Sequence, residues 1–280
     1  MPEIHGAKIA IGGKGGVGKT TVSAILAQLF AETGYDVLAI DADPDVNLAS
    51  AFGLPYEQSP QPLIKMKELI AERTGTGKDT LGAYFKLNPK VSDVPQEYWI
   101  EVKGLKLLVL GAITQAGAGC ACPEGAFLKA LLTHTILQRQ EVVMVDLAAG
   151  VEFMGRASVQ GIDALVLVVE PGARSIETAK NMAQMARKLG IRCVGAVANK
   201  IVEPAQTEVI ESQLHDTVLL GSIGYSRALQ EADLNRASVF EADPEVTEEL
   251  RRAKDRLTEL IARPKTTTEI QNVISINENA

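Results

Sequence analysis

Cysteine is scarce in this sequence, with three residues among 280. So few cysteines exclude the dense disulfide framework of small secreted proteins. Long apolar runs are missing too, since none approaches the roughly 20 residues that a membrane-spanning helix needs. The first apolar run, Ala7–Ile11, is too short for a secretory signal. We therefore expect a cytoplasmic protein with reduced thiols and no membrane partner.

An excess of positive charge is also missing. The formal net charge is −7 and the pI is near 5.2, which disfavours nucleic-acid binding through bulk electrostatics. We therefore expect no nucleic-acid partner. Because 46% of the residues are hydrophobic and no proline-, glycine- or serine-rich linker divides the chain, residues 1–263 are predicted to form one domain. Residues 264–280 are predicted to be a polar tail that is disordered or adds an edge strand.

Short apolar runs alternate with segments of helical periodicity almost from end to end. The runs show little polar alternation, which is typical of strands buried on both faces. The sequence therefore predicts an α/β protein with a mostly parallel sheet of about seven strands, flanked by helices on both faces. The predicted strands are Ala7–Ile11, Val37–Ile40, Leu105–Leu110, Val142–Val145, Ala164–Val169, Val194–Ala198 and Val218–Leu220.

The most informative stretch reads GGKGGVGKTT, from Gly12 to Thr21. It contains G-x-x-x-x-G-K-[ST], the phosphate-binding loop, between a predicted strand and an amphipathic helix. Glycines let successive backbone N–H groups converge on an anion. Lys19 is predicted to contact the β- and γ-phosphates, and the Thr20 hydroxyl to bind Mg²⁺. The alternative is a turn that merely joins strand to helix. The predicted nucleotide-binding residues here are Gly13, Lys14, Gly15, Gly16, Val17, Gly18, Lys19, Thr20 and Thr21.

Carboxylates follow two of the predicted strands. Asp41 and Asp43 come after the second strand, and Asp146 ends the fourth, four residues before Gly150. Carboxylates at strand ends beside a phosphate loop can hold the water shell of Mg²⁺ or orient the attacking water. Asp146 is typical of a Walker B aspartate. An aspartate-capped turn is the alternative for the first group.

Asn199 and Lys200 end a later predicted strand. An asparagine in this position can contact the edge of an adenine base, so both residues are predicted to belong to the nucleotide site. A turn residue at the end of a strand is the alternative for Asn199.

Cys120 and Cys122 form a C-x-C motif in a glycine-rich stretch that leads into a predicted helix. A helix N-terminus lowers thiol pKa values and so favours thiolates. Zinc and other thiophilic metals usually take four ligands, whereas one chain offers two thiolates. A homodimer that faces its two motifs across a two-fold axis would supply four. Two small residues in a tight turn are the alternative. Cys193, within a predicted strand, is expected to be a buried small hydrophobic residue.

Taken together, these motifs resemble a known family. K-G-G-V-G-K-T-T is similar to the deviant phosphate loop of the family that includes MinD, ParA and the nitrogenase iron protein. In that family the extra lysine, here Lys14, reaches the nucleotide of the partner subunit. The additional C-A-C-P, E-P-G-A-R-S and V-A-N-K segments resemble the nickel-insertion ATPases of the CooC type.

The resemblance implies a function and a set of roles. It implies an ATP hydrolase that forms a homodimer with ATP and Mg²⁺, with catalytic Lys14, Lys19, Asp43 and Asp146. It places Asp43 at the attacking water and Asp41 near the metal. Cys120 and Cys122 of both subunits would bind Ni²⁺ or Zn²⁺, for delivery of nickel to carbon monoxide dehydrogenase or acetyl-CoA synthase.

Two departures from the pattern concern the second switch. Ala148 stands where the CooC type usually has an acidic residue, and Phe153 stands where it has a histidine. They put the client enzyme in doubt but not nucleotide binding. Two other functions stay open, a ParA- or MinD-like positioning ATPase and a reductase with a [4Fe–4S] cluster between subunits, like the nitrogenase iron protein.

Overall fold

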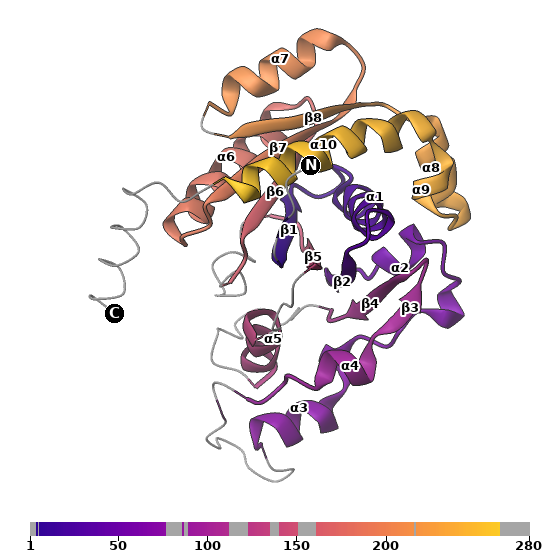
Figure 1. Cartoon of the computed structure of the whole chain (residues 1–280), viewed down its shortest axis with the longest axis vertical. Coiled ribbons are helices and arrows are strands. Elements are labelled where there is room, and N and C mark those ends of the chain that lie inside the picture. The colour runs from indigo at the N-terminus through magenta and orange to yellow at the C-terminus, as the bar shows by residue number, and fades with distance from the viewer. Residues whose placement is uncertain are drawn as a thin grey trace.

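A computed structural model describes residues 4, 6–76, 86, 89–111, 123–134, 140–150, 161–215 and 217–263. Their strands form one eight-stranded sheet in the order β3-β4-β2-β5-β1-β6-β7-β8, which runs through the centre of the molecule (Figure 1). The strands are β1 Ala7–Gly13, β2 Asp36–Ala42, β3 Ile100–Val102, β4 Leu105–Val109, β5 Glu141–Leu147, β6 Ala164–Val169, β7 Cys193–Ile201 and β8 Val218–Gly224. The predicted α/β class with a mostly parallel sheet is confirmed.

One strand was not predicted. β3 pairs antiparallel with β4, whereas the other neighbouring strands of the described sheet pair in parallel. Lys103 and Gly104 join β3 to β4 and both have positive φ angles, 49° and 78°, as a tight hairpin turn requires. A strand of three residues at an edge of the sheet carries too little apolar sequence to be recognised from its pattern.

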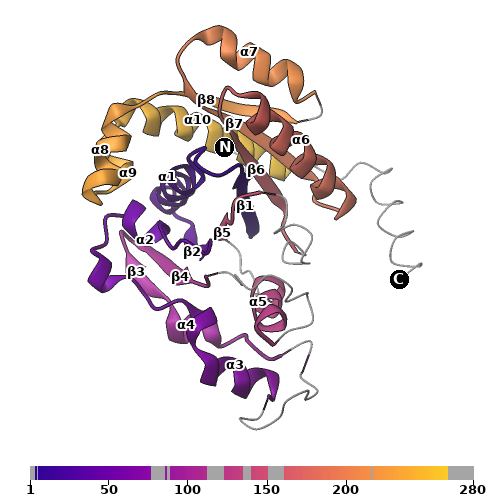
Figure 2. The same cartoon turned by 180° about the vertical axis from the view of Figure 1, so that it is seen from behind.

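Helices cover both faces of the sheet, as Figures 1 and 2 show from opposite sides. Alternate strand residues point to opposite faces, so Ile9 and Ile11 join one buried cluster and Ala10 joins the other. The first cluster packs against α1 Lys19–Glu32, α2 Leu48–Ala51, α8 Arg227–Asn235, α9 Val239–Ala242 and α10 Pro244–Ala262. The second packs against α3 Lys67–Thr74, α4 Val94–Tyr98, α5 Pro123–His134, α6 Ala173–Lys188 and α7 Pro204–Gln213.

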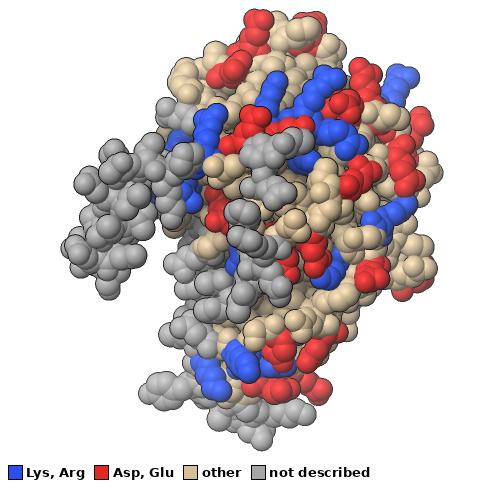
Figure 3. All heavy atoms as spheres, in the orientation of Figure 1, with Lys and Arg blue, Asp and Glu red and all other residues tan. Residues whose placement is uncertain are grey.

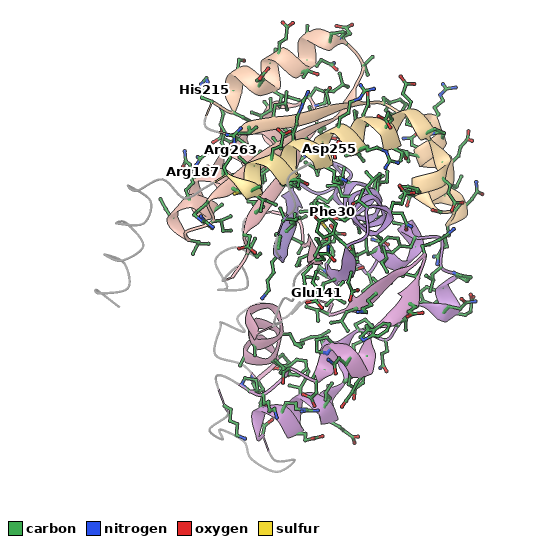
Figure 4. The ribbon with its side chains drawn as sticks, in the orientation of Figure 1. Phe30, Glu141, Arg187, His215, Asp255 and Arg263 are labelled. Atoms are coloured by element: carbon green, nitrogen blue, oxygen red, sulfur yellow. The ribbon has the colours of Figure 1, made fainter. Side chains whose placement is uncertain are left out.

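The apolar spacing of Leu250, Ala253, Leu257, Leu260 and Ile261 predicts a helix over residues 246–261, and α10 agrees closely with this prediction. Asp243 caps α10, because its carboxylate accepts hydrogen bonds from the backbone N–H groups of Glu245 and Val246. The helix packs on α1 and β8, and the Lys254 ammonium lies 5.7 Å from the centre of the Phe30 ring. Figure 4 labels Phe30 on α1.

The spacing of Leu63, Met66, Leu69 and Ile70 predicts one helix over residues 62–73, but in the structure this helix is interrupted. A short 3-10 helix, η2 Leu63–Lys65, is followed by Met66 with a ψ of 71° and then by α3. A second 3-10 helix, η1 Tyr56–Gln58, precedes them. The periodicity of the leucines and isoleucines continues across Met66, which is why the sequence pattern does not reveal the break.

The surface and the helices of the described residues show two further properties. On the face drawn in Figure 3, acidic and basic side chains are interspersed. Within the described parts of the chain, no helix is both long enough and apolar enough to span a bilayer. The predicted tail at 264–280 lies outside the described residues.

Candidate functional site

The phosphate loop connects β1 to α1 and is held in a conformation that needs glycine. Gly13, Gly16 and Gly18 have φ angles of 151°, 80° and 97°, which side chains with a Cβ rarely adopt. A Cβ on Gly13 would lie 2.5 Å from the carbonyl oxygen of Val168 on β6. At Gly13 the loop therefore lies tightly against the neighbouring strand β6.

The N-terminus of α1 is suited to an anion. In the described structure no side chain caps it, and its first turn contains no acidic residue. Unpaired N–H groups and the positive end of the helix dipole therefore remain for a phosphate group. Lys19 lies in this first turn and is only 7% exposed. Thr20 and Thr21 follow it, both partly buried.

Asn199 and Lys200, at the end of β7, support the loop from the other side. The Asn199 side-chain amide donates to the carbonyl of Val17 at 2.8 Å and accepts from the Lys200 backbone N–H at 2.8 Å. A Cβ on Gly18 would collide with the same amide. Lys200 has a φ of 60°, and its ammonium donates to the carbonyl of Gly16 at 2.5 Å. Contact of either residue with a base stays a prediction.

A second lysine of the loop, Lys14, pairs with an acidic residue at the rim of the site. The Lys14 ammonium lies 3.5 Å from one carboxylate oxygen of Glu170, and the Lys14 side chain is 39% exposed. The other Glu170 oxygen lies 3.4 Å from the Lys200 ammonium. Glu170 follows β6 and therefore joins two lysines at the rim of the site.

Asp146, near the end of β5, lies beneath the first turn of α1. It is 1% exposed and accepts a hydrogen bond from the Ser23 hydroxyl at 3.0 Å. Burial raises the pKa of Asp146 to about 6, although hydrogen bonds from Thr20 and Ser23 and the charge of Lys19 lower it. Its second oxygen has no hydrogen-bond partner among the described residues.

This unpaired oxygen fits a magnesium ion. A buried carboxylate oxygen without a partner is costly, and a hard cation with its water shell would satisfy it. The Thr20 hydroxyl beside Asp146 is the second oxygen ligand that such a site needs. The residues present therefore suit Mg²⁺.

Asp41 lies beside Asp146 in the sheet, because the two residues are paired in register across β2 and β5. Asp41 is fully buried. Its two oxygens accept backbone hydrogen bonds from Asp43 at 3.1 Å, Asn47 at 3.0 Å and Leu48 at 2.9 Å. Burial and then the charge of Asp146 raise the pKa of Asp41 to about 7. Through these hydrogen bonds the Asp41 carboxylate holds the segment after β2 in place.

Asp43 lies in the segment that Asp41 holds. It is partly buried, and one carboxylate oxygen accepts from the backbone N–H of Asp45 at 3.0 Å. Asp43 is close enough to Asp146 to contribute to raising its pKa. After β5, the Gly150 N–H donates to the carbonyl of Gly13 at 3.1 Å, which joins the segment that follows Asp146 to the phosphate loop.

The predicted metal ligands Cys120 and Cys122 lie outside the described residues, as does Phe153. Among the described residues, histidine, cysteine and acidic side chains form no group of three that could hold a metal ion. Cys193 is partly buried at the start of β7, and its thiol donates to the carbonyl of Leu260 at 3.5 Å. It lies at the amino end of its strand, away from the carboxyl ends that carry the phosphate loop.

Two residues of the site were not found by sequence reasoning. Ser23 follows Thr20 by three positions, the helical spacing that places both hydroxyls on one side of α1. Glu170 stands at the carboxyl end of a buried strand, as Asp41 and Asp146 do, and this position was the available signal. The Glu170 backbone N–H donates to the hydroxyl of Ser175, which is 2% exposed.

Comparisons with known proteins agree with this geometry. Residues 8–239 match the model of the CobQ/CobB/MinD/ParA nucleotide binding domain. The carbon monoxide dehydrogenase accessory protein CooC of Rhodospirillum rubrum is 44% identical, over 85% of this chain and 90% of its own. An uncharacterised ATP-binding protein of Methanocaldococcus jannaschii is 41% identical, over 78% of this chain and 84% of its own.

Solved structures show a similar fold. The septum site-determining protein MinD of Pyrococcus horikoshii, in complex with Mg-ADP, has a TM-score of 0.66 and 17% identity. The match covers 93% of this chain and 100% of that protein. At this identity the likeness concerns the fold.

Proposed function

Since the chain belongs to the CobQ/CobB/MinD/ParA family of nucleotide-binding proteins and, within it, to the CooC-type ATPases, we propose that it is an ATP-dependent metallochaperone. ATP closes a homodimer in this proposal. Cys120 and Cys122 of both subunits then hold one Ni²⁺ or Zn²⁺, and hydrolysis is coupled to delivery of nickel to a client enzyme in the cytoplasm. The relative from Rhodospirillum rubrum is named for carbon monoxide dehydrogenase, so the client is that enzyme or the related acetyl-CoA synthase.

The observation that carries this proposal is the contrast between the two lysines of the loop. Lys19 is buried at the N-terminus of α1, where it is placed for the phosphates of its own subunit. Lys14 is 39% exposed and lies 3.5 Å from Glu170 at the rim. A nucleotide bound by one subunit does not need a second lysine, so Lys14 is available to contact the nucleotide of a partner subunit.

Hydrolysis within this site follows from the same residues. Phosphoryl transfer depends on positioning and on charge stabilisation. Lys19 binds the transferred phosphoryl group, Thr20 and Asp146 hold the magnesium site, and Asp43 orients the attacking water. When bound, Mg²⁺ would neutralise charge that develops on the phosphate oxygens.

Dimerisation and metal binding depend on each other in this proposal. One C-x-C motif offers two thiolates, whereas a closed site for Zn²⁺ or Ni²⁺ takes four ligands. Metal bound by Cys120 and Cys122 of both subunits therefore favours the dimer, and ATP favours the dimer as well. By linkage, each ligand then tightens binding of the other.

A reductase is the second candidate, because the iron-sulfur ATP-binding protein of light-independent protochlorophyllide reductase from Halorhodospira halophila is 27% identical over 90% of this chain. The position of Cys193 argues against it. In a reductase like the nitrogenase iron protein, the two cluster cysteines of each subunit come from separate loops, whereas Cys193 lies within β7 at the amino end of the strand.

The decisive experiment measures metal per dimer with and without ATP. Purified full-length protein, loaded with Zn²⁺ or Ni²⁺, is analysed by native mass spectrometry and elemental analysis. The Cys120→Ala/Cys122→Ala double variant should lose the metal and keep ATP binding by the monomer. Cys193→Ala is the matched control and should keep the metal. A double variant that still binds one metal per dimer at parental affinity would exclude the metal site and favour a positioning ATPase.

Two further outcomes of the same preparation separate the alternatives. Iron with an absorbance band near about 400 nm, as iron–sulfur clusters show, would favour the reductase. Sedimentation of Lys14→Ala with ATP and Mg²⁺ should show monomer where the parent shows dimer. An unchanged dimer would refute the role of Lys14 across the interface.

A further inference from the structure

Glu170 occupies a fixed position between two lysines of the nucleotide site. Its backbone N–H donates to the buried hydroxyl of Ser175 at 3.1 Å, which fixes the turn between β6 and α6. One oxygen of its carboxylate faces Lys14 at 3.5 Å and the other faces Lys200 at 3.4 Å. The carboxylate is 27% exposed, so it is neither a solvated surface group nor a buried one.

The two lysines are held to different degrees. The Lys200 ammonium also donates to the carbonyl of Gly16 at 2.5 Å, so it has a second partner within the phosphate loop. For Lys14 the ion pair that the structure shows is with Glu170, at a distance longer than a short charged hydrogen bond. Lys14 therefore loses fewer interactions than Lys200 when it moves away from Glu170.

We propose that Glu170 is a positioning residue that holds Lys14 within its own subunit until the nucleotide of a partner displaces it. This inference rests on the proposed role of Lys14 across the dimer interface. In this proposal the Lys14 ammonium leaves Glu170 when it contacts the phosphates of the other subunit. Dimerisation therefore exchanges a carboxylate for a polyphosphate as the partner of Lys14.

The exchange makes the dimer depend on phosphate charge. Triphosphate with its magnesium offers more oxygen ligands than one carboxylate, whereas an empty partner site offers none. Glu170 would thus disfavour the dimer in the absence of ATP and permit it in its presence. Lys200 remains with Glu170 after Lys14 leaves, so the carboxylate keeps one opposite charge when the interface closes.

The test is Glu170→Gln, which removes the charge and keeps the size of the side chain. Exposed ion pairs contribute little, so the dissociation constant of the dimer should fall by about two- to tenfold. It is measured by sedimentation of the full chain with Mg²⁺ and a slowly hydrolysed ATP analogue. Asp36→Asn is the matched control, because Asp36 pairs with Lys106 at 2.6 Å on β2 and β4, and it should leave dimerisation unchanged.

A direct measurement on Lys14 separates positioning from a general structural effect. Without nucleotide, acetylation of Lys14 should be faster in Glu170→Gln by about two- to fivefold relative to Lys180 in the same sample, because the Lys14 amine is no longer held against a carboxylate. An unchanged rate, together with an unchanged dimer, would overturn the inference.

The failure of this inference differs from the failure of the proposed function. If Lys14→Ala prevents dimerisation while Glu170→Gln changes neither the dimer nor the labelling, the role of Lys14 stands and that of Glu170 falls. If Glu170→Gln strengthens association equally in a Lys14→Ala background, Glu170 acts through another residue and the inference also falls. If Lys14→Ala dimerises normally, the proposed function is what fails.

Discussion

The two halves of the phosphate site differ in how far they are shielded from water. On the β2–β5 side, Asp41 and Asp146 are 0% and 1% exposed. On the β6–β7 side, the side chains of Glu170 and Lys200 are 27% and 40% exposed. The first half contains two carboxylates and is closed within one chain, whereas the second contains an ion pair and faces outward.

This difference explains the chemistry assigned to each half. Two buried carboxylates side by side are unfavourable, and burial accordingly raises the pKa of both. A cation that binds there relieves this cost, so the buried half is prepared for Mg²⁺. Ion pairs in the exposed half are weak, which suits groups that must change partners when a second subunit binds.

The largest effect should come from Asp146→Asn. The amide cannot replace the anionic oxygen at the magnesium site, so kcat/KM for ATP should fall by about 100-fold or more. The same change removes a buried charge, so the protein without nucleotide should become more stable at pH 8. Steady-state hydrolysis and thermal unfolding measure the two effects. We therefore expect Asp146→Asn to have lower ATPase activity and higher stability than the parent.

Asp41→Asn is the matched comparison in the same half. Asp41 has the same burial as Asp146, but its oxygens already bind backbone N–H groups. We therefore expect a smaller loss of activity, below about tenfold. An equal loss in both variants would mean that Asp41 also belongs to the magnesium site.

Asp43→Ala should reduce turnover while sparing nucleotide affinity. The side chain lies in the segment that Asp41 holds, and removal of a group that orients water affects the transition state more than the bound substrate. We expect kcat to fall by about 10- to 100-fold with an almost unchanged dissociation constant for ATP. Hydrolysis at the parental rate would contradict the assignment of the attacking water to Asp43.

Stability should depend on pH through the buried carboxyl pair. The pKa values of Asp41 and Asp146 rise to about 7 and about 6 in the folded protein, from an ordinary value of 3.8. The folded state therefore binds more protons than the unfolded state between these values, and stability falls as the pH rises from about 4 to about 7. Denaturant unfolding without nucleotide should show a loss of stability across this range, of at most about 1.4 kcal/mol for each unit of pKa shift.

The control for this prediction removes the titrating group. Asp146→Asn should flatten the dependence on pH, because one of the two carboxyls no longer titrates. Saturating Mg²⁺ and ATP should also reduce the slope in the parent, since the cation stabilises the ionised form. A slope unchanged in Asp146→Asn would assign the effect to other groups.

The fold could be predicted from the sequence to the extent that its strands are buried on both faces. Continuous apolar runs such as the one in β6 identify buried strands, because helices cover both faces of such strands. β3 could not be predicted, since it has three residues and the exposed Glu101 at its centre. The break at Met66 depends on backbone angles that apolar periodicity does not report.

Within the site, the residues that could be predicted are those whose signal lies in one short stretch of sequence. The phosphate loop could be predicted because its residues are consecutive, so one motif contains the glycines, Lys14 and Lys19. Glu170 could not be assigned a role, since its partners Lys14 and Lys200 are distant in sequence and meet it only through the strand order β1-β6-β7. The support of the loop by Asn199 likewise depends on β7 reaching the loop in space.

The smallest effect should come from Lys200→Met, which changes the exposed half. The substitution removes the ammonium that donates to the Gly16 carbonyl and one partner of Glu170, while keeping an unbranched side chain. Since the lysine is 40% exposed, the cost in stability should stay below about 1 kcal/mol. Nucleotide affinity should weaken by about two- to fivefold, because a loop that has lost a hydrogen bond is less well ordered for phosphate. Lys180→Met is the control, since Lys180 pairs with Gln213 on α7 at 2.6 Å, and it should leave affinity unchanged. A loss of affinity as large as that of Asp146→Asn would show that the exposed half is as rigidly preformed as the buried one.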